Sequence, residues 1–167
     1  RDSYLNSREM FLDCRERISV TGFTDIQRAA MFYVLVKTGF GASLRTFGCN
    51  KKRLNTDNFA DIEARLDGVV IENKDFEDLI KVYDREKALF YCDPPYHKTE
   101  RHYTVKFTED DHERLCRVLH QIKGRFVLSY NDDKYVRDLY KDYNIQAVTR
   151  NNSLSSGDFK EVIITNF

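Results

Sequence analysis

The residues of this chain best suited to chemistry are Asp93-Pro94-Pro95-Tyr96, which directly follow the short apolar segment 89–92. Two consecutive prolines fix the backbone and remove two N–H donors, so the carbonyl of Pro94 has a set direction. A carboxylate and a carbonyl held close together accept both hydrogens of a planar amino group, and Tyr96 can lie flat against the ring that carries this group. The tetrapeptide therefore predicts a site for an aminated base.

The alternative interpretation of this tetrapeptide is a rigid turn at the exit of a strand, with Asp93 as a local cap. Its position in the chain favours binding, because residues 88–92 are predicted to form a strand. Ligands of open α/β sheets bind outside the carboxyl ends of the strands.

The composition fits a soluble, reduced protein without a metal site. The 167 residues, 41% of them hydrophobic, suffice for one sizeable core or for two small units that share one. The four cysteines have no paired spacing, and neither a signal peptide nor a long apolar stretch occurs. His97 and His102 share a predicted loop but have no carboxylate or thiolate at ligand spacing, so we expect no metal.

Charge is balanced over the whole chain, with 27 basic and 27 acidic residues, but it is unevenly distributed. No acidic residue occurs between Ile26 and Thr56, whereas this window contains the basic residues Arg28, Lys37, Arg45, Lys51, Lys52 and Arg53. Such a window predicts a positive surface that contacts phosphates. A solvated helix end followed by a basic loop is the alternative.

The order of the predicted elements divides the chain into a helical region, 1–67, and an α/β region, 68–167. In the first region we expect helices at about 4–17, 25–38 and 58–66, with a basic loop at 40–56. In the second we expect strands at 69–72, 88–92, 125–129, 145–149 and 160–165, and helices at 76–82, 108–122 and 133–141. Asn131 or Asp132 is expected to cap the last helix.

Alternation of strands and helices predicts a parallel, doubly wound sheet. The last two strands are close enough in sequence to pair antiparallel, which places an antiparallel strand at the end of an otherwise parallel sheet.

Several further segments, spread over nearly the whole chain, resemble the amino-methyltransferases that modify adenine in DNA, specifically the Dam-like class. In the order and at about the spacing of this family stand 28–33, 37–40, Arg45 with Gly48 and Asn50, 75–76, 93–96, 107–108, 128–131 and 161–166. The resemblance implies a Rossmann-like methyltransferase fold with a small helical target-recognition region. It also implies methyl transfer from S-adenosylmethionine to the amino group of an adenine flipped out of double-stranded DNA.

The resemblance implies roles for individual residues of the reaction site. Tyr96 would stack on the flipped adenine, while Asp93 and the carbonyl of Pro94 would accept hydrogen bonds from its amino group, with Pro95 completing the catalytic tetrapeptide. The cofactor-binding residues would be Asp75, Phe76 and Asp93. For Asp75 and Phe76 the alternative is a helix N-cap followed by a core phenylalanine.

The resemblance also implies a set of DNA contacts. Arg45 would contact a base or a phosphate, and Lys51, Lys52 and Arg53 would contact phosphates. Tyr103 would belong to a segment that closes over the flipped base, or is an incidental aromatic in a mobile loop. A polar loop with Arg150, Asn152 and Ser153 would hold the phosphate beside the flipped nucleotide, or is simply a hairpin turn.

The chain departs from the family pattern in its cofactor motif. The Phe-x-Gly-x-Gly turn that cradles the methionine of the cofactor does not occur, because Gly39-Phe40-Gly41 follows a helix instead of a strand. The acidic residue that holds the ribose is missing as well. We therefore expect a fragment that is truncated before this motif, lacks the N-terminal strands and is inactive alone.

Three functions remain open at this stage. The first is a site-specific DNA adenine methyltransferase of a restriction-modification system, a phage or a solitary enzyme. The second is methylation of an RNA base or of a protein amide, although related amide methyltransferases tend to have asparagine in place of Asp93. The third is a non-catalytic DNA-binding remnant, against which the intact tetrapeptide argues. We expect a monomeric, cytoplasmic protein, bacterial or phage-encoded, whose partner is double-stranded DNA and not a membrane.

Overall fold

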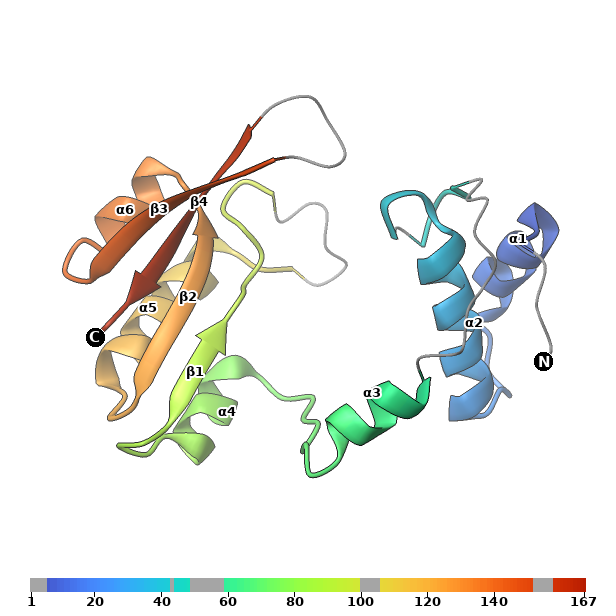
Figure 1. Ribbon diagram of the computed structural model, residues 1–167, viewed down its shortest axis with the longest axis horizontal. Coiled ribbons are helices and arrows are strands. Elements are labelled where there is room, and N and C mark those ends of the chain that lie inside the picture. Colours follow the sequence, from blue (N-terminus) through green and yellow to red (C-terminus); the bar gives the residue numbers. More distant parts are fainter. Residues whose placement is uncertain (1–5, 43, 49–58, 100–105, 152–157) are drawn as a thin grey trace. The chain divides into compact units, whose positions relative to one another are not determined.

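The computed structural model describes residues 6–42, 44–48, 59–99, 106–151 and 158–167 (Figure 1). The chain forms two units, Arg1–Val70 and Ile71–Phe167, and each is treated separately below. None of the helices in these described ranges has the length and apolar character needed to cross a membrane.

The first unit is built on a pair of helices, α1 (Arg8–Arg17) and α2 (Asp25–Thr38). They pack through the buried side chains of Phe11, Cys14 and Leu35. A capping box starts α2, because the hydroxyl of Thr24 accepts from the N–H of Gln27 while the Gln27 side chain accepts from the N–H of Thr24. A third helix, α3 (Phe59–Leu66), also belongs to this unit.

A short loop at the end of α2 is closed by backbone pairing. The 3-10 turn η1 (Phe40–Ala42) begins it, and Gly39 and Phe47 form an isolated β-bridge. The N–H of Gly48 donates to the carbonyl of Thr38 over 2.7 Å. A Cβ atom at Gly48 would lie 3.0 Å from the backbone of Gly39, so a side chain there would require these two segments to move apart by a few tenths of an ångström.

The second unit contains a mixed sheet with the strand order β1-β2-β4-β3. Its strands are β1 (Leu89–Cys92), β2 (Arg125–Asn131), β3 (Asn144–Asn151) and β4 (Asp158–Thr165). β1 and β2 are parallel, whereas β4 runs antiparallel to both β2 and β3. The expected antiparallel pair is confirmed, but the antiparallel strand lies inside the sheet. Its predicted place at the end of the sheet was wrong, because β4 also pairs with β2.

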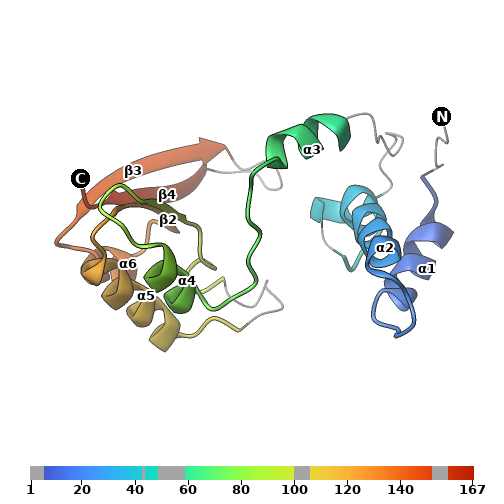
Figure 2. The same cartoon turned by 90° about the horizontal axis from the view of Figure 1, so that it is seen from below.

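One face of this sheet is covered by α4 (Phe76–Tyr83), α5 (Glu109–Gln121) and α6 (Lys134–Leu139) (Figure 2). The core between them contains Phe126, Leu128 and Tyr130 of β2 and Val162 and Ile164 of β4. On β1 the alternate side chains Leu89 and Tyr91 are 63% and 68% exposed. Among the described residues of this unit, helices therefore cover a single face, in contrast to the doubly wound arrangement expected from the sequence.

Two local predictions were wrong. Residues 69–72 form no strand, and Val70 and Ile71 are 73% and 81% exposed, because no described strand lies beside them to pair with their backbone. Helix α6 is capped by Asp133, and not by Asn131 or Asp132. The reason is that β2 continues to Asn131, while Asp132 binds the side chain of Arg137.

At the amino ends of β1 and β2, a carboxylate joins two turns. Asp84, which follows α4, accepts hydrogen bonds from the backbone N–H groups of Lys123 and Gly124, over 2.9–3.0 Å. A Cβ atom at Gly124 would lie 2.7 Å from the carbonyl oxygen of Ala88 and 2.9 Å from that of Arg85. These contacts bring the start of β2 against the start of β1.

Replacing Gly124 by alanine should therefore destabilise the second unit. We expect Gly124→Ala to lower the free energy of unfolding by about 1–3 kcal/mol, the usual effect of overpacking a tight contact. Denaturant unfolding followed by circular dichroism measures this change. Lys123→Ala is the matched control, because Lys123 contributes a backbone N–H to Asp84 that alanine retains. Equal stability of the two variants would contradict the role assigned to this contact.

Candidate functional site

The predicted tetrapeptide lies at the carboxyl end of β1, beside the parallel strand β2. Cys92 pairs with Leu128 in the sheet, so Asp93 comes next to Ser129. The hydroxyl of Ser129 donates to Oδ1 of Asp93 over 2.8 Å. The neighbouring strand thus fixes the orientation of the carboxylate.

Tyr96 is held at the same edge of the sheet by β4. Its hydroxyl donates to Oε1 of Glu161 over 3.2 Å, and Glu161 is only 7% exposed. The Tyr96 ring is almost parallel to that of Phe159, with an angle of 12° and 6.1 Å between centroids. Burial is the main cause that raises the pKa of Tyr96 to about 12, so the phenol stays protonated at neutral pH.

A cavity of about 360 Å³ opens beside β1 and brings Phe76 of α4 together with Asp93 and Pro94. Its remaining lining is mostly apolar and is supplied by Leu79, Ile80, 89–92, Phe107 and Leu115. An apolar cavity whose lining includes one acidic residue suits a flat ligand that carries a polar or positively charged group. Two residues that the sequence assigned to the cofactor, Phe76 and Asp93, therefore line a common cavity.

Asp75, the third predicted cofactor residue, is not among the residues that line this cavity. It caps α4, where its Oδ1 accepts from the N–H of Glu77 over 2.9 Å. Both of its carboxylate oxygens also accept from Arg114, over 2.7 and 3.0 Å. These contacts, the one with Arg114 foremost, lower the pKa of Asp75 below its ordinary value.

Arg114 connects this cap to the wall of the cavity. Its guanidinium lies over the Phe76 ring, 4.1 Å from the centroid, and it also binds Asp111 over 2.9 Å. The predicted alternative for Asp75, a helix N-cap, is therefore its observed position, while Phe76 has one face against Arg114.

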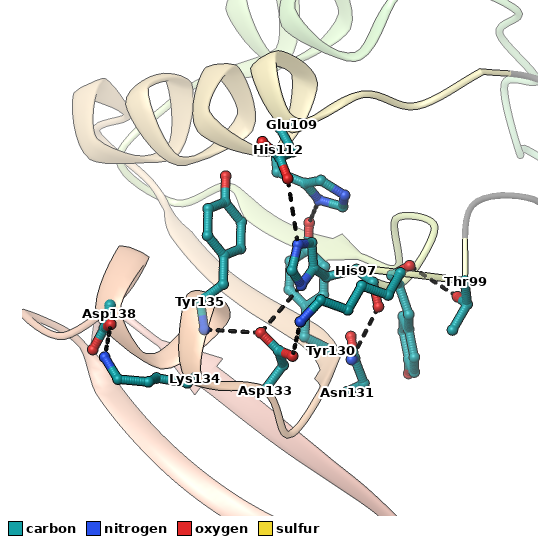
Figure 3. A network of polar contacts seen from close by, with 12 residues as sticks. His97, Thr99, Glu109, His112, Tyr130, Asn131, Asp133, Lys134, Tyr135 and Asp138 are labelled. Atoms are coloured by element: carbon teal, nitrogen blue, oxygen red, sulfur yellow. Dashed lines mark hydrogen bonds and ion pairs between the residues drawn. The ribbon is translucent and has the colours of Figure 1, made fainter.

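Residues 97–99, directly after Tyr96, are held by a polar network (Figure 3). His97 is 5% exposed, and its Nδ1 lies 3.1 Å from Oδ1 of Asp133. Asn131 donates through Nδ2 to the carbonyl of His97 over 3.2 Å. In the ranges that the structure describes, no cluster of histidine, cysteine and acidic residues could hold a metal ion.

Only part of the predicted DNA-contacting set lies in the described ranges. Arg45 is exposed on the loop after η1, where its carbonyl accepts from Arg15 over 2.9 Å. Arg150 belongs to β3 and pairs with Phe159, so its expected place in a loop was wrong, because the hairpin strands extend further than predicted. The other predicted contacts lie outside the described residues: Lys51, Lys52, Arg53, Tyr103, Asn152 and Ser153.

Sequence reasoning missed the residues that orient the site: Ser129, Glu161, Phe159, Arg114, His97 and Asp133. Ser129 and Glu161 fall inside segments that carried the family resemblance, but no individual role could be assigned to them. His97 was considered only as a metal ligand. The only sequence feature that could have indicated a role for His97 in the site is its position directly after the tetrapeptide.

Two comparisons with known proteins bear on this site. The model of the family described as "D12 class N6 adenine-specific DNA methyltransferase" matches residues 1–154. The match includes the tetrapeptide and the loop that carries Arg45, and it ends before β4 (Asp158–Thr165). A search of curated proteins found no match.

The ion pairs of Arg114 predict a specific dependence of stability on pH. Because the pKa of Asp75 is lower in the folded chain than its unfolded value of about 3.9, its contribution is complete above that value and is lost as the pH falls through the folded value. The midpoint of urea unfolding should therefore fall between pH 6 and pH 2, a range of about two units on either side of that unfolded pKa. We expect this fall to be smaller in Arg114→Gln.

Arg117→Gln, an exposed change on the same helix, is the control for this measurement. It should keep the steeper decline of the unaltered protein. An identical pH profile for Arg114→Gln and the unaltered protein would show that these ion pairs add nothing to stability.

Proposed function

Since this chain belongs to the D12 class of N6 adenine-specific DNA methyltransferases, we propose that it places a flipped adenine for methylation by S-adenosylmethionine. The observation that carries the proposal is that Asp93, whose carboxylate is oriented by Ser129, lines an apolar cavity. The reaction needs an acceptor of this kind at a fixed place, because the amino group of adenine must be held in one orientation.

The base-binding side of the proposed site consists of Asp93, Pro94 and Tyr96. Among the described residues, no donor contacts Oδ2 of Asp93, so this oxygen can accept one amino hydrogen and the carbonyl of Pro94 the other. Tyr96 offers an aromatic face for stacking on a base that has left the duplex. Its bond to Glu161 restrains the plane of the ring.

Asp93 is also suited to activate the amino nitrogen of adenine as a nucleophile. Hydrogen bonds to the carboxylate and the carbonyl draw the nitrogen towards a tetrahedral shape and make its lone pair available. Transfer of the methyl group would release the cofactor as its thioether, S-adenosylhomocysteine, and leave a positively charged amino group with both of its hydrogens. One of these protons is acidic enough to pass to water, so no unusually basic residue is needed. Tyr96 is unsuited as a base at neutral pH, because burial raises its pKa to about 12.

The cavity beside β1 fits the proposed cofactor in part. When bound, S-adenosylmethionine supplies an electrophilic methyl group on a sulfonium. Phe76 would pack against its adenine ring, and Asp93 and Pro94, which line the same cavity, would lie beside its methyl group. Asp75 would act indirectly, by capping α4 and holding Arg114 against Phe76.

We further propose a division of labour between the two units. The region 1–67 would recognise DNA through Arg45 and the basic residues Lys51, Lys52 and Arg53, and the region 68–167 would form the catalytic part of a Rossmann-like fold. Tyr103, Arg150, Asn152 and Ser153 would contact the DNA around the flipped nucleotide. The partner is double-stranded DNA, bound by a monomer.

Removing the carboxylate of Asp93 should strongly reduce methyl transfer. In the natural full-length protein that contains this sequence, we expect Asp93→Ala to lower kcat by at least about 10²–10³-fold, the usual effect of losing one electrostatic contact to a reacting group. Incorporation of labelled methyl groups into an adenine-containing duplex measures this loss. Asp142→Asn, an exposed acid in the same unit, is the control.

Ser129→Ala separates the presence of the carboxylate from its orientation. We expect a smaller loss than in Asp93→Ala, about tenfold, because Asp93 remains but its hydrogen bond to Ser129 is gone. Normal methylation by Asp93→Ala would refute the proposed site. A full-length protein that binds the duplex but transfers no methyl group would instead favour a DNA-binding remnant.

We also propose that the 167-residue chain alone turns over no substrate. The sequence contains no Phe-x-Gly-x-Gly turn after a strand, so the part of the cofactor site that this turn supplies in the family is missing. The purified chain should therefore incorporate no label under conditions in which the full-length protein does. Detectable multiple turnover by the chain would contradict this expectation.

A further inference from the structure

We propose that His97 is a positioning residue for methyl transfer, because its hydrogen bond to Asp133 docks the loop after Tyr96 onto the start of α6. The inference rests on the function proposed above. It assigns His97 an effect on the direction of the Pro94 carbonyl and on the plane of Tyr96, without contact to the substrate.

The His97 ring is enclosed by residues of two helices, α5 and α6 (Figure 3). It stacks on Tyr135 of α6, with 4.4 Å between centroids and an angle of 22°. It meets His112 of α5 edge-on, with 5.8 Å between centroids, and its Nε2 lies 4.0 Å from Oε1 of Glu109. The ring therefore has one place in the packing, with Nδ1 directed at Asp133.

Asp133 carries several contacts at once. Its Oδ1 also accepts from the N–H of Tyr135 over 2.8 Å, which caps α6, and its Oδ2 is 3.2 Å from Nζ of Lys98. Burial opposes ionisation of Asp133, but the contacts with Tyr135, Lys98 and His97 outweigh it and lower the pKa. Asp133 is therefore ionised at neutral pH, so Nδ1 of His97 donates to it.

The backbone around His97 depends on the same contacts. Tyr96 accepts through its carbonyl from both the N–H and the hydroxyl of Thr99, over 2.9 and 2.8 Å. Lys98 has φ = 66°, in the left-handed region that is unfavourable for a lysine. The ion pair of Lys98 with Asp133 and the bond from Asn131 to the carbonyl of His97 stabilise this turn.

The position of this turn matters because of the two prolines before it. Pro94 and Pro95 restrict their own φ angles, so the segment from Asp93 to His97 moves largely as a stiff piece. Its first end is attached to β2 through Asp93 and Ser129, and its second end to α6 through His97 and Asp133. Tyr96 with Glu161 and Asn131 with the His97 carbonyl also hold this segment, so loss of the bond to Asp133 releases its second end only partly and lets that end shift. A displacement of about 1 Å at a reacting group can lower the rate about 10²-fold.

Two replacements of His97 separate positioning from packing. His97→Phe keeps a flat ring for Tyr135 but cannot donate to Asp133, whereas His97→Asn keeps a donor near the place of Nδ1 and loses most of the ring. In the full-length protein we expect His97→Phe to lower kcat about 10²-fold, with KM for duplex and cofactor changed less than about threefold. His97→Asn should retain more of kcat, even if it is the less stable protein.

Asp133→Asn keeps the test decisive if a variant of His97 fails to fold, because it alters the same hydrogen bond from the other side and should by itself lower kcat. Asparagine is a good N-cap, so α6 should persist while the charged acceptor is lost. We expect His97→Phe and Asp133→Asn to be non-additive in kcat, because they break the same hydrogen bond. Lys134→Ala, a surface change on α6 with its side chain 88% exposed, is the control and should leave kcat unchanged.

The outcomes separate this inference from the function on which it rests. A full-length protein that methylates no adenine overturns the proposed function. A protein that methylates adenine, but in which His97→Phe has a normal kcat or performs better than His97→Asn, overturns only the positioning role. Simple additivity of His97→Phe and Asp133→Asn overturns it as well.

Discussion

The parallel pairing of β1 with β2 is the constraint on which the candidate site depends. Because Cys92 pairs with Leu128, the next residues along the two strands are Asp93 and Ser129, close enough for the hydroxyl to hold the carboxylate. A shift of one residue would bring Ser129 out of reach and turn the apolar side chains of β1 to the other face. Asp84 secures the opposite end of the same pair through the N–H groups of Lys123 and Gly124.

The polar contacts at the carboxyl ends of β1 and β2 share one feature. Each group of the tetrapeptide region is held by a partner from a different element: Asp93 by β2, Tyr96 by β4, and His97 by the start of α6. The partners are largely buried, where a hydrogen bond left unmade is costly. Residues 93–99 are thereby positioned by contacts that are distant in sequence, although they form no helix or strand.

The sequence was most informative where a local signal and the fold agree. Paired prolines after an apolar run located the tetrapeptide, and glycine and capping residues located α2. It failed at 69–72, because an apolar, β-branched run becomes a strand only when another strand is available for pairing. Contacts such as Tyr96 with Glu161 join residues 65 positions apart, so no local pattern could reveal them.

Asp75 shows that a residue that caps a helix can also shape a binding site without touching the ligand. As a cap, Asp75 starts α4 at the residue that lines the cavity, Phe76, and its carboxylate holds Arg114 across one face of that ring. Arg114 in turn needs Asp111, which belongs to the first turn of α5. The wall of the cavity is therefore set by an ion-pair network between two helix starts. On the proposed function, this network fixes the ring against which the cofactor packs, and a carboxylate does so without contacting the ligand.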